Sequence, residues 1–213
     1  MALTNIQLEK FDQLVSDFVN EDGETKRVDV YIPIVAGGQL VKDAERRKCE
    51  NQHIRVDHIE VSGKSVIDLG CNTGYVSAEL ARKGASEVVG VDIKQELVDI
   101  GNYVKEVDNL TNLSFVCQNK IDFTLNTNRV FDVGLNMSNF GYEETIDDLT
   151  RYGHIAKVWY IEPTNHPHWE EGFWDEDRIK EWGSTELSQF GKVEFLTLTD
   201  YQDRGFFKLT MNE

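Results

Sequence analysis

Short apolar runs recur along the chain between residues 64 and 161, and helical patterns follow the first two of them. The runs are predicted strands, at 65–69, 87–91, 113–117, 129–135 and 157–161. The clearest helix covers 93–107, where apolar residues recur in steps of three and four. Strands that alternate with helices predict a parallel sheet covered on both faces, so the chain is assigned to the α/β class.

The C-terminal region predicts a different connection. A helix is expected over 175–190, and two further strand runs follow at 193–199 and 205–211. Only a short turn, 200–204, separates these two runs. Because a parallel crossover needs about a dozen residues or more, the two strands must pair antiparallel. The sequence therefore predicts a mostly parallel sheet whose last hairpin is antiparallel.

The first 60 residues lack this pattern, and we divide the chain into an N-terminal helical cap or extension, 1–60, and a core domain, 61–213. Apolar residues from Ile6 to Phe18 predict one helix, which ends near Gly23. The segment 28–33 is expected to be a short strand or an extended arm. The charged segment 42–51 is expected to be helical.

Charge and cysteine content exclude several classes of protein. The 22 basic and 38 acidic residues give a formal charge of −16, which argues against broad binding to nucleic acid or anionic membranes. Three well-separated cysteines favour neither a disulfide framework nor a thiolate zinc site. No signal peptide or membrane-spanning run is apparent, so we expect a soluble cytoplasmic protein without a resident metal.

The strongest chemical motif is the first core strand with its glycine-bearing loop, Gly70–Gly74. Glycines let the backbone approach a ligand, and the helix start behind them offers free N–H groups. Asp92 follows the second strand, 18 residues after Gly74, where its carboxylate can accept from both hydroxyls of a ribose. A nicotinamide dinucleotide would favour G-x-G-x-x-G, whereas here the spacing is G-x-x-x-G. Asp68 just before the loop would repel a pyrophosphate but suits a cationic amino-acid group.

The segments Val66–Tyr75 and Val89–Ile93 resemble the class I S-adenosylmethionine-dependent methyltransferase family. The resemblance covers roughly Ser65 to Met211 and implies a Rossmann-like seven-stranded sheet with the order 3-2-1-4-5-7-6. It also implies S-adenosyl-L-methionine as the cofactor. The family loop often reads G-x-G-x-G, and here Asn72 stands at the middle position, a residue that tolerates positive φ.

The resemblance also implies the cofactor-binding residues. The methionine end would be lined by Asp68, Gly70, Asn72 and Gly74. Asp92 would hold the ribose, and Ile93, Ile121 and Asp122 would surround the adenine, although the last two could equally belong to an ordinary polar loop. Asn136 ends the fourth strand and could contact the cofactor through its carbonyl or orient a substrate. The segment 136–140 is not the Asn-Pro-Pro-Tyr type of box, which disfavours methylation of exocyclic nitrogens on DNA.

Candidate catalytic and substrate-binding residues lie in two further segments. His166 or His168 could deprotonate a hydroxyl, and Glu162 could orient that histidine or bind a polar substrate. Trp169 could line a substrate pocket. Arg46 and Arg47 could hold a substrate carboxylate or phosphate. The segment with the two histidines could instead be an ordinary solvated loop with one packed histidine. Arg46 and Arg47 could instead lie on a solvated helix face.

We therefore expect a methyltransferase that acts on a small polar metabolite or sugar, most simply at oxygen. An RNA or protein methyltransferase, a non-catalytic cofactor-binding partner subunit and a nicotinamide oxidoreductase remain the alternatives. The acceptor cannot be read from the cofactor motif, because fold and function are separable.

Overall fold

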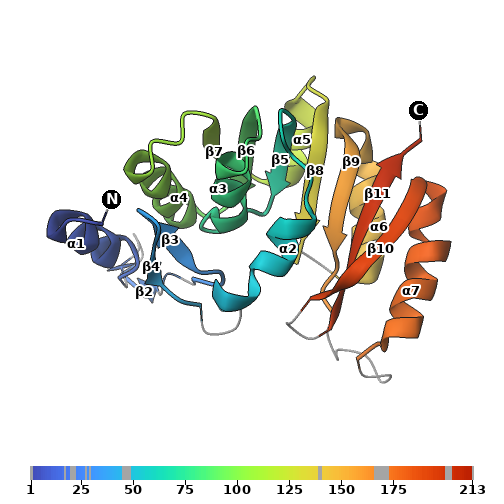
Figure 1. Ribbon diagram of the computed structural model, residues 1–213, viewed down its shortest axis with the longest axis horizontal. Coiled ribbons are helices and arrows are strands. Elements are labelled where there is room, and N and C mark those ends of the chain that lie inside the picture. The colour runs from blue at the N-terminus through green and yellow to red at the C-terminus, as the bar shows by residue number, and fades with distance from the viewer. Residues whose placement is uncertain are drawn as a thin grey trace.

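The computed structural model describes residues 2–16, 18–19, 23–26, 28, 30–44, 49–138, 141–165, 173–199 and 203–212. Its centre is a seven-stranded sheet with the order β10-β11-β9-β8-β5-β6-β7 (Figure 1). The strands are β5 (Ser65–Leu69), β6 (Glu87–Asp92), β7 (Leu113–Cys117), β8 (Phe131–Met137), β9 (Ala156–Glu162), β10 (Gly191–Thr199) and β11 (Arg204–Met211). Counted along the core domain this order is 3-2-1-4-5-7-6, and β10 and β11 are antiparallel to their neighbours. The predicted fold is confirmed.

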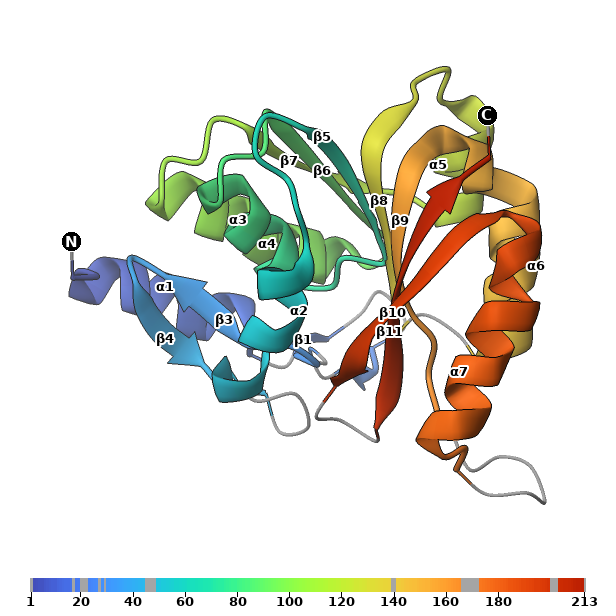
Figure 2. The same ribbon diagram turned by 45° about the vertical axis from the view of Figure 1, so that its right-hand side comes forward.

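Helices cover both faces of the sheet (Figure 2). One face carries α2 (His53–His58), α3 (Tyr75–Arg82) and α4 (Gln95–Val107), and the other carries α5 (Lys120–Asn126), α6 (Tyr142–Tyr152) and α7 (Glu176–Thr185). Successive strand residues face opposite cores: Val66 packs in one hydrophobic cluster and Ile67 in the other. This double burial explains why the central strands appear as continuous apolar runs.

The turn from β5 into α3 requires glycine at position 74. Gly74 has φ of 78°, and a Cβ at this position would lie 2.3 Å from the ring of Phe115 on β7. The helix therefore starts in close contact with the neighbouring part of the sheet. This contact fixes the loop that precedes α3.

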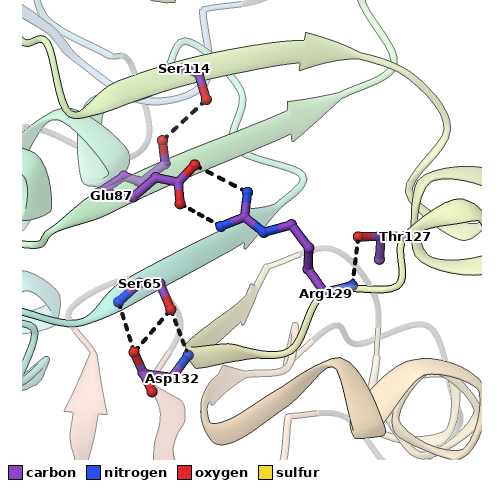
Figure 3. A network of polar contacts seen from close by, with 7 residues as sticks. Ser65, Glu87, Ser114, Thr127, Arg129 and Asp132 are labelled. Atoms are coloured by element: carbon purple, nitrogen blue, oxygen red, sulfur yellow. Dashed lines mark hydrogen bonds and ion pairs between the residues drawn. The ribbon is translucent and has the colours of Figure 1, made fainter.

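The edge of the sheet opposite the strand carboxyl ends is held by a polar network (Figure 3). Asp132 accepts from the Ser65 backbone N–H at 3.0 Å and from the Ser65 hydroxyl at 2.9 Å. Arg129 forms a two-pronged pair with Glu87 at the start of β6. Lys157, and then Ser65, lower the pKa of Asp132 to about 2. The starts of β5, β6 and β8 are thereby joined, at the end of the sheet opposite the strand carboxyl ends.

The N-terminal segment contains more than helices. Its described residues form α1 (Asn5–Leu14), a hairpin of β1 (Phe18–Val19) and β2 (Thr25–Lys26), a hairpin of β3 (Ile34–Ala36) and β4 (Gln39–Lys42), a 3-10 turn at Cys49–Asn51, and α2. Phe11 on α1 packs on Tyr103 of α4 with ring centroids 4.7 Å apart. The backbone N–H of Gly37 donates to Asp108 at the end of α4 at 2.6 Å. The segment therefore docks on the α4 side of the core.

Two N-terminal predictions need correction. The predicted helix over 42–51 is wrong for its described residues, because Lys42 ends a strand and Cys49–Asn51 form only a 3-10 turn. Gly37 and Gly38 both have positive φ and form the two-residue turn of the β3–β4 hairpin, a geometry that such turns require. The predicted first helix is also too long, since α1 ends at Leu14. No strand includes a described residue of 28–33.

The helix predicted over 175–190 is divided. Its main part is α7, and a 3-10 turn follows at Leu187–Gln189. Among the described residues, no helix combines the length and apolar character needed to cross a bilayer.

Candidate functional site

A cavity of about 400 Å³ opens at the carboxyl ends of the central strands. Four residues of the predicted cofactor site line it: Asp68, Gly70, Asn72 and Asp92. Ligands of open parallel sheets bind at this edge, where the order of the strands reverses on either side of β5. Its volume lies in the range typical of small-molecule sites. These four residues therefore line one cavity, and their roles in binding a cofactor stay predictions.

The loop after β5 adopts the conformation that its residues favour. Gly70 and Asn72 have φ of 78° and 52°. The Asn72 side chain accepts from the backbone N–H of Thr73 at 2.9 Å, which stabilises the left-handed backbone locally. The N–H groups of Gly70 and Cys71 both donate to the carbonyl of Val91, at 2.8 and 3.0 Å. Asn72 thus replaces the glycine of the usual motif without displacing the loop from β6.

Asp92 is held by backbone donors on both sides. Its Oδ2 accepts from the Asn72 N–H at 2.9 Å, and its Oδ1 accepts from the Lys94 N–H at 3.0 Å. A carboxylate has about four acceptor positions, so further capacity remains on both oxygens. Asp92 lines the cavity with its orientation already fixed. This arrangement suits a ligand that presents two adjacent hydroxyls.

Asp68 lies deeper than Asp92 and is 3% exposed. Burial, with a contribution from the charge of Asp92, raises the pKa of Asp68 to about 6, against the hydrogen bond that Ser77 donates. The Ser77 hydroxyl lies 2.5 Å from Asp68 Oδ2. A buried carboxylate without a cation is energetically costly. A positively charged ligand group beside Asp68 would therefore be favoured.

Several predicted cofactor residues lie outside the lining of this cavity. Gly74 contacts Phe115 instead, and Ile93 is 64% exposed just beyond β6. Ile121 donates its N–H to the Asn119 side chain at the start of α5, at 2.9 Å, and Asp122 is in the first turn of that helix. The side chain of Asn136 donates to Asp148 on α6 at 3.3 Å. The adenine-side assignments of Ile93, Ile121 and Asp122, and the contact through Asn136, stay predictions.

Glu162 belongs to a buried polar cluster, here called the Glu162 cluster: Arg55, Ser138, Glu162, Thr199 and Arg204. Its carboxylate pairs with Arg55 and lies 3.9 Å from Arg204 Nη1. It also accepts from the hydroxyls of Ser138 at 3.3 Å and Thr199 at 3.2 Å. Glu162 and Arg204 are 0% exposed. The carboxylate is therefore surrounded by protein donors.

Two members of the Glu162 cluster, Arg55 and Ser138, also line the cavity. Arg55 Nη2 donates to the Ser138 hydroxyl at 2.8 Å. Sequence reasoning missed Arg55, because α2 has only six residues and no readable periodicity. It also missed Tyr31 and Ile32, which line the same cavity from the N-terminal segment.

Arg46, Arg47, His166, His168 and Trp169 lie outside the described residues, so their predicted roles are untested. Within the described part of the chain, no group of three or more His, Cys, Asp or Glu side chains is placed to hold a metal ion.

Comparisons with protein families, curated proteins and solved structures all find similarity to methyltransferases. Residues 60–152 match the family described as a methyltransferase domain. The chain is 32% identical over 127 residues to a ubiquinone biosynthesis O-methyltransferase of Coxiella burnetii, a match covering 60% of this chain and 46% of that protein. The chain thus spans less than half the length of these curated relatives.

Two solved structures share the fold at low sequence identity. The bifunctional kinase-methyltransferase WbdD is similar with a TM-score of 0.56 and 21% identity, over 76% of this chain and 37% of that one. The magnesium protoporphyrin IX methyltransferase of Synechocystis, solved with bound S-adenosylmethionine, gives a TM-score of 0.52 and 17% identity, over 75% and 74%. Residues 60–152 thus match a methyltransferase domain, and the strand order and the solved structures show the fold of class I S-adenosylmethionine-dependent methyltransferases.

Proposed function

We propose that the protein transfers a methyl group from S-adenosyl-L-methionine to a hydroxyl of a small polar molecule. The observation that carries the proposal is the pair of carboxylates in one cavity, Asp92 fixed by backbone donors and Asp68 buried beside it. When bound, the cofactor supplies an electrophilic methyl group together with its leaving group.

The lining of the cavity fits this cofactor chemically. Asp92 offers acceptors for the ribose hydroxyls, and Asp68 offers a negative charge for the ammonium group. Arg55 supplies a positive charge in the same cavity, which fits the carboxylate of the amino-acid part. A cavity with both charges suits a zwitterion better than a pyrophosphate, which disfavours a dinucleotide.

A small acceptor is supported by charge and by similarity. The formal charge of −16 opposes binding of a phosphate backbone. The curated relatives are named as O-methyltransferases of ubiquinone biosynthesis, which is consistent with a hydroxyl acceptor. These relatives are longer proteins, so the identity of the acceptor is left open.

The chain's own residues would mainly align the reactants and exclude water. Alignment of nucleophile, carbon and leaving sulfur can lower the barrier by several kcal/mol, roughly 7–11 in ideal cases. As the bond from the acceptor oxygen to carbon forms and the carbon–sulfur bond breaks, the hydroxyl proton must leave. We propose His166 or His168 as the base that takes it, with Trp169 walling the acceptor site and Arg46 or Arg47 binding an acidic acceptor.

An activity measurement tests the proposal. The purified protein is incubated with S-adenosylmethionine and panels of polar hydroxyl compounds, RNA and protein, and formation of S-adenosylhomocysteine is followed. Turnover with a small hydroxyl compound supports the proposal. Turnover only with RNA or protein refutes the acceptor class, and cofactor binding without any turnover favours a non-catalytic partner subunit.

A further inference from the structure

The Glu162 cluster joins parts of the chain that are far apart in sequence. Arg55 comes from α2, Ser138 follows β8, Glu162 ends β9, and Thr199 and Arg204 flank the turn of the last hairpin. The side chain of His58 on α2 also meets Phe206 of β11 edge-on, with ring centroids 6.3 Å apart. Figure 1 shows α2 between α3 and the last hairpin. The cluster therefore connects the cavity wall to the C-terminal hairpin.

Burial makes the geometry of the cluster restrictive. Glu162 and Arg204 are 0% exposed, and Arg55 is 4% exposed. Charges removed from water are tolerated only where their partners are well placed, so these side chains have little freedom to reorient. Loss of the carboxylate would leave two neighbouring guanidinium groups without the anion between them.

The backbone of α2 is fixed independently of the Glu162 cluster. The ammonium group of Lys83, directly after α3, donates to the carbonyls of Val56, Asp57 and Ile59, at 2.7, 3.1 and 2.9 Å. The Glu60 N–H donates to the Tyr160 hydroxyl at 3.1 Å. The helix position is thus set by α3 and β9, while the Arg55 side chain is held by Glu162, by Ser138 and, more weakly at 3.4 Å, by the Gln52 side chain. A change at Glu162 should affect Arg55 without displacing α2.

We propose that Glu162 is a positioning residue, which holds Arg55 and Ser138 at the cavity wall and thereby sets the affinity for the amino-acid part of the cofactor. This inference rests on the proposed function. It assigns Glu162 a role different from the one that its sequence position suggests, the orientation of a catalytic histidine. Thr199 and Arg204 contact Glu162 from the last hairpin and help to hold its carboxylate in place.

Two ligands that differ in the amino-acid part distinguish a specific role of Glu162 from a general loss of site structure. S-adenosylhomocysteine carries the amino-acid part, whereas 5′-methylthioadenosine has the same adenosine and a thioether but no amino-acid part. Calorimetric titration of both ligands into the wild-type protein and Glu162→Gln gives two dissociation constants for each protein. We expect the variant to bind S-adenosylhomocysteine at least tenfold more weakly, with less than a threefold change for 5′-methylthioadenosine.

Arg129→Gln is the matched control, because it breaks the ion pair with Glu87 at the opposite edge of the sheet. It should change neither affinity. If Glu162→Gln does not fold, Thr199→Val removes one hydroxyl donor to Glu162 and should still weaken S-adenosylhomocysteine selectively, by about threefold.

The remaining outcomes overturn the inference. Equal weakening of both ligands would show general damage to the site. Unchanged binding of S-adenosylhomocysteine with lost turnover would make Glu162 part of the proton-transfer machinery instead. A wild-type protein that binds neither ligand would refute the proposed function itself, whereas a wild-type protein that binds both, with an unchanged ratio in the variants, refutes only the role of Glu162.

Discussion

Two carboxylates, close together in one cavity, are placed in opposite environments. Asp92 accepts backbone hydrogen bonds on both oxygens, while Asp68 is buried with one serine donor. The first is suited to neutral hydroxyl donors and the second to a cation. This difference in environment is the basis of the separate roles that we propose for Asp68 and Asp92 in binding one ligand.

Substitution Asp92→Ala should weaken binding of S-adenosylhomocysteine by roughly 100-fold, about 3 kcal/mol, because two hydrogen bonds to a charged acceptor are lost. Calorimetric titration measures the change. Asp99→Ala on the exposed side of α4 is the control and should bind as the wild type does. An unchanged affinity in Asp92→Ala would remove the ribose assignment.

Asp68 should make the stability of the ligand-free protein depend on pH. Its pKa in the folded protein is about 6, above the ordinary value of 3.8. The folded state therefore holds the proton more tightly, and the resulting stabilisation is complete below pH 3.8 and lost as the pH rises through 6. The difference between these values corresponds to about 3 kcal/mol at most.

Asp68→Asn removes this titration. Urea unfolding at pH 5 and pH 7.5 should show that the variant gains more stability over the wild type at pH 7.5 than at pH 5. Asp99→Asn serves as the control without such a difference. The same gain at both pH values would mean that Asp68 is not the titrating group.

At the scale of elements, the junction of β5 and α3 depends on one close approach. Gly74 and Gly63 have similar φ angles, 78° and 71°, but a Cβ on Gly74 would meet Phe115 at 2.3 Å while one on Gly63 would meet nothing within 4 Å. Alanine at Gly63 would therefore introduce backbone strain alone, whereas alanine at Gly74 would introduce backbone strain and a steric clash.

Gly63→Ala should lower the free energy of unfolding by about 1 kcal/mol, the cost of the left-handed backbone alone. Gly74→Ala should cost about 1–3 kcal/mol more, because the ring of Phe115 must move. Urea unfolding of both variants gives the comparison. Equal losses would show that β7 does not constrain this loop.

Some elements could be predicted from the sequence and others could not. The bounds predicted for β5 and β7 match the structure, because each strand is a short, mainly apolar run. Strand β5 is buried on both faces, whereas β7 lies at the edge of the sheet and is mostly half-buried. Helix α6 was not predicted, since its buried face includes the polar residues Thr145 and Asp148, which interrupt the apolar period. The β3–β4 hairpin was missed because its strands are short and its glycine pair was interpreted only as a break.

The same contrast applies to the site at the scale of the whole molecule. Asp68, Gly70, Asn72 and Asp92 lie in one strand–loop–helix–strand unit, so the local pattern could place them together. Arg55 reaches the cavity through the packing of α2 against α3 and the last hairpin, a long-range arrangement that no local pattern encodes. The cavity thus combines a motif shared by a large family with a wall supplied by the N-terminal segment.

The most direct test of the account is a crystal structure of the protein with S-adenosylhomocysteine. We expect the ligand in the cavity at the ends of β5, β6 and β8. Its ribose hydroxyls should lie within hydrogen-bonding distance of Asp92, its ammonium beside Asp68 and its carboxylate facing Arg55. A ligand bound elsewhere, or one whose ribose makes no contact with Asp92, would contradict the account.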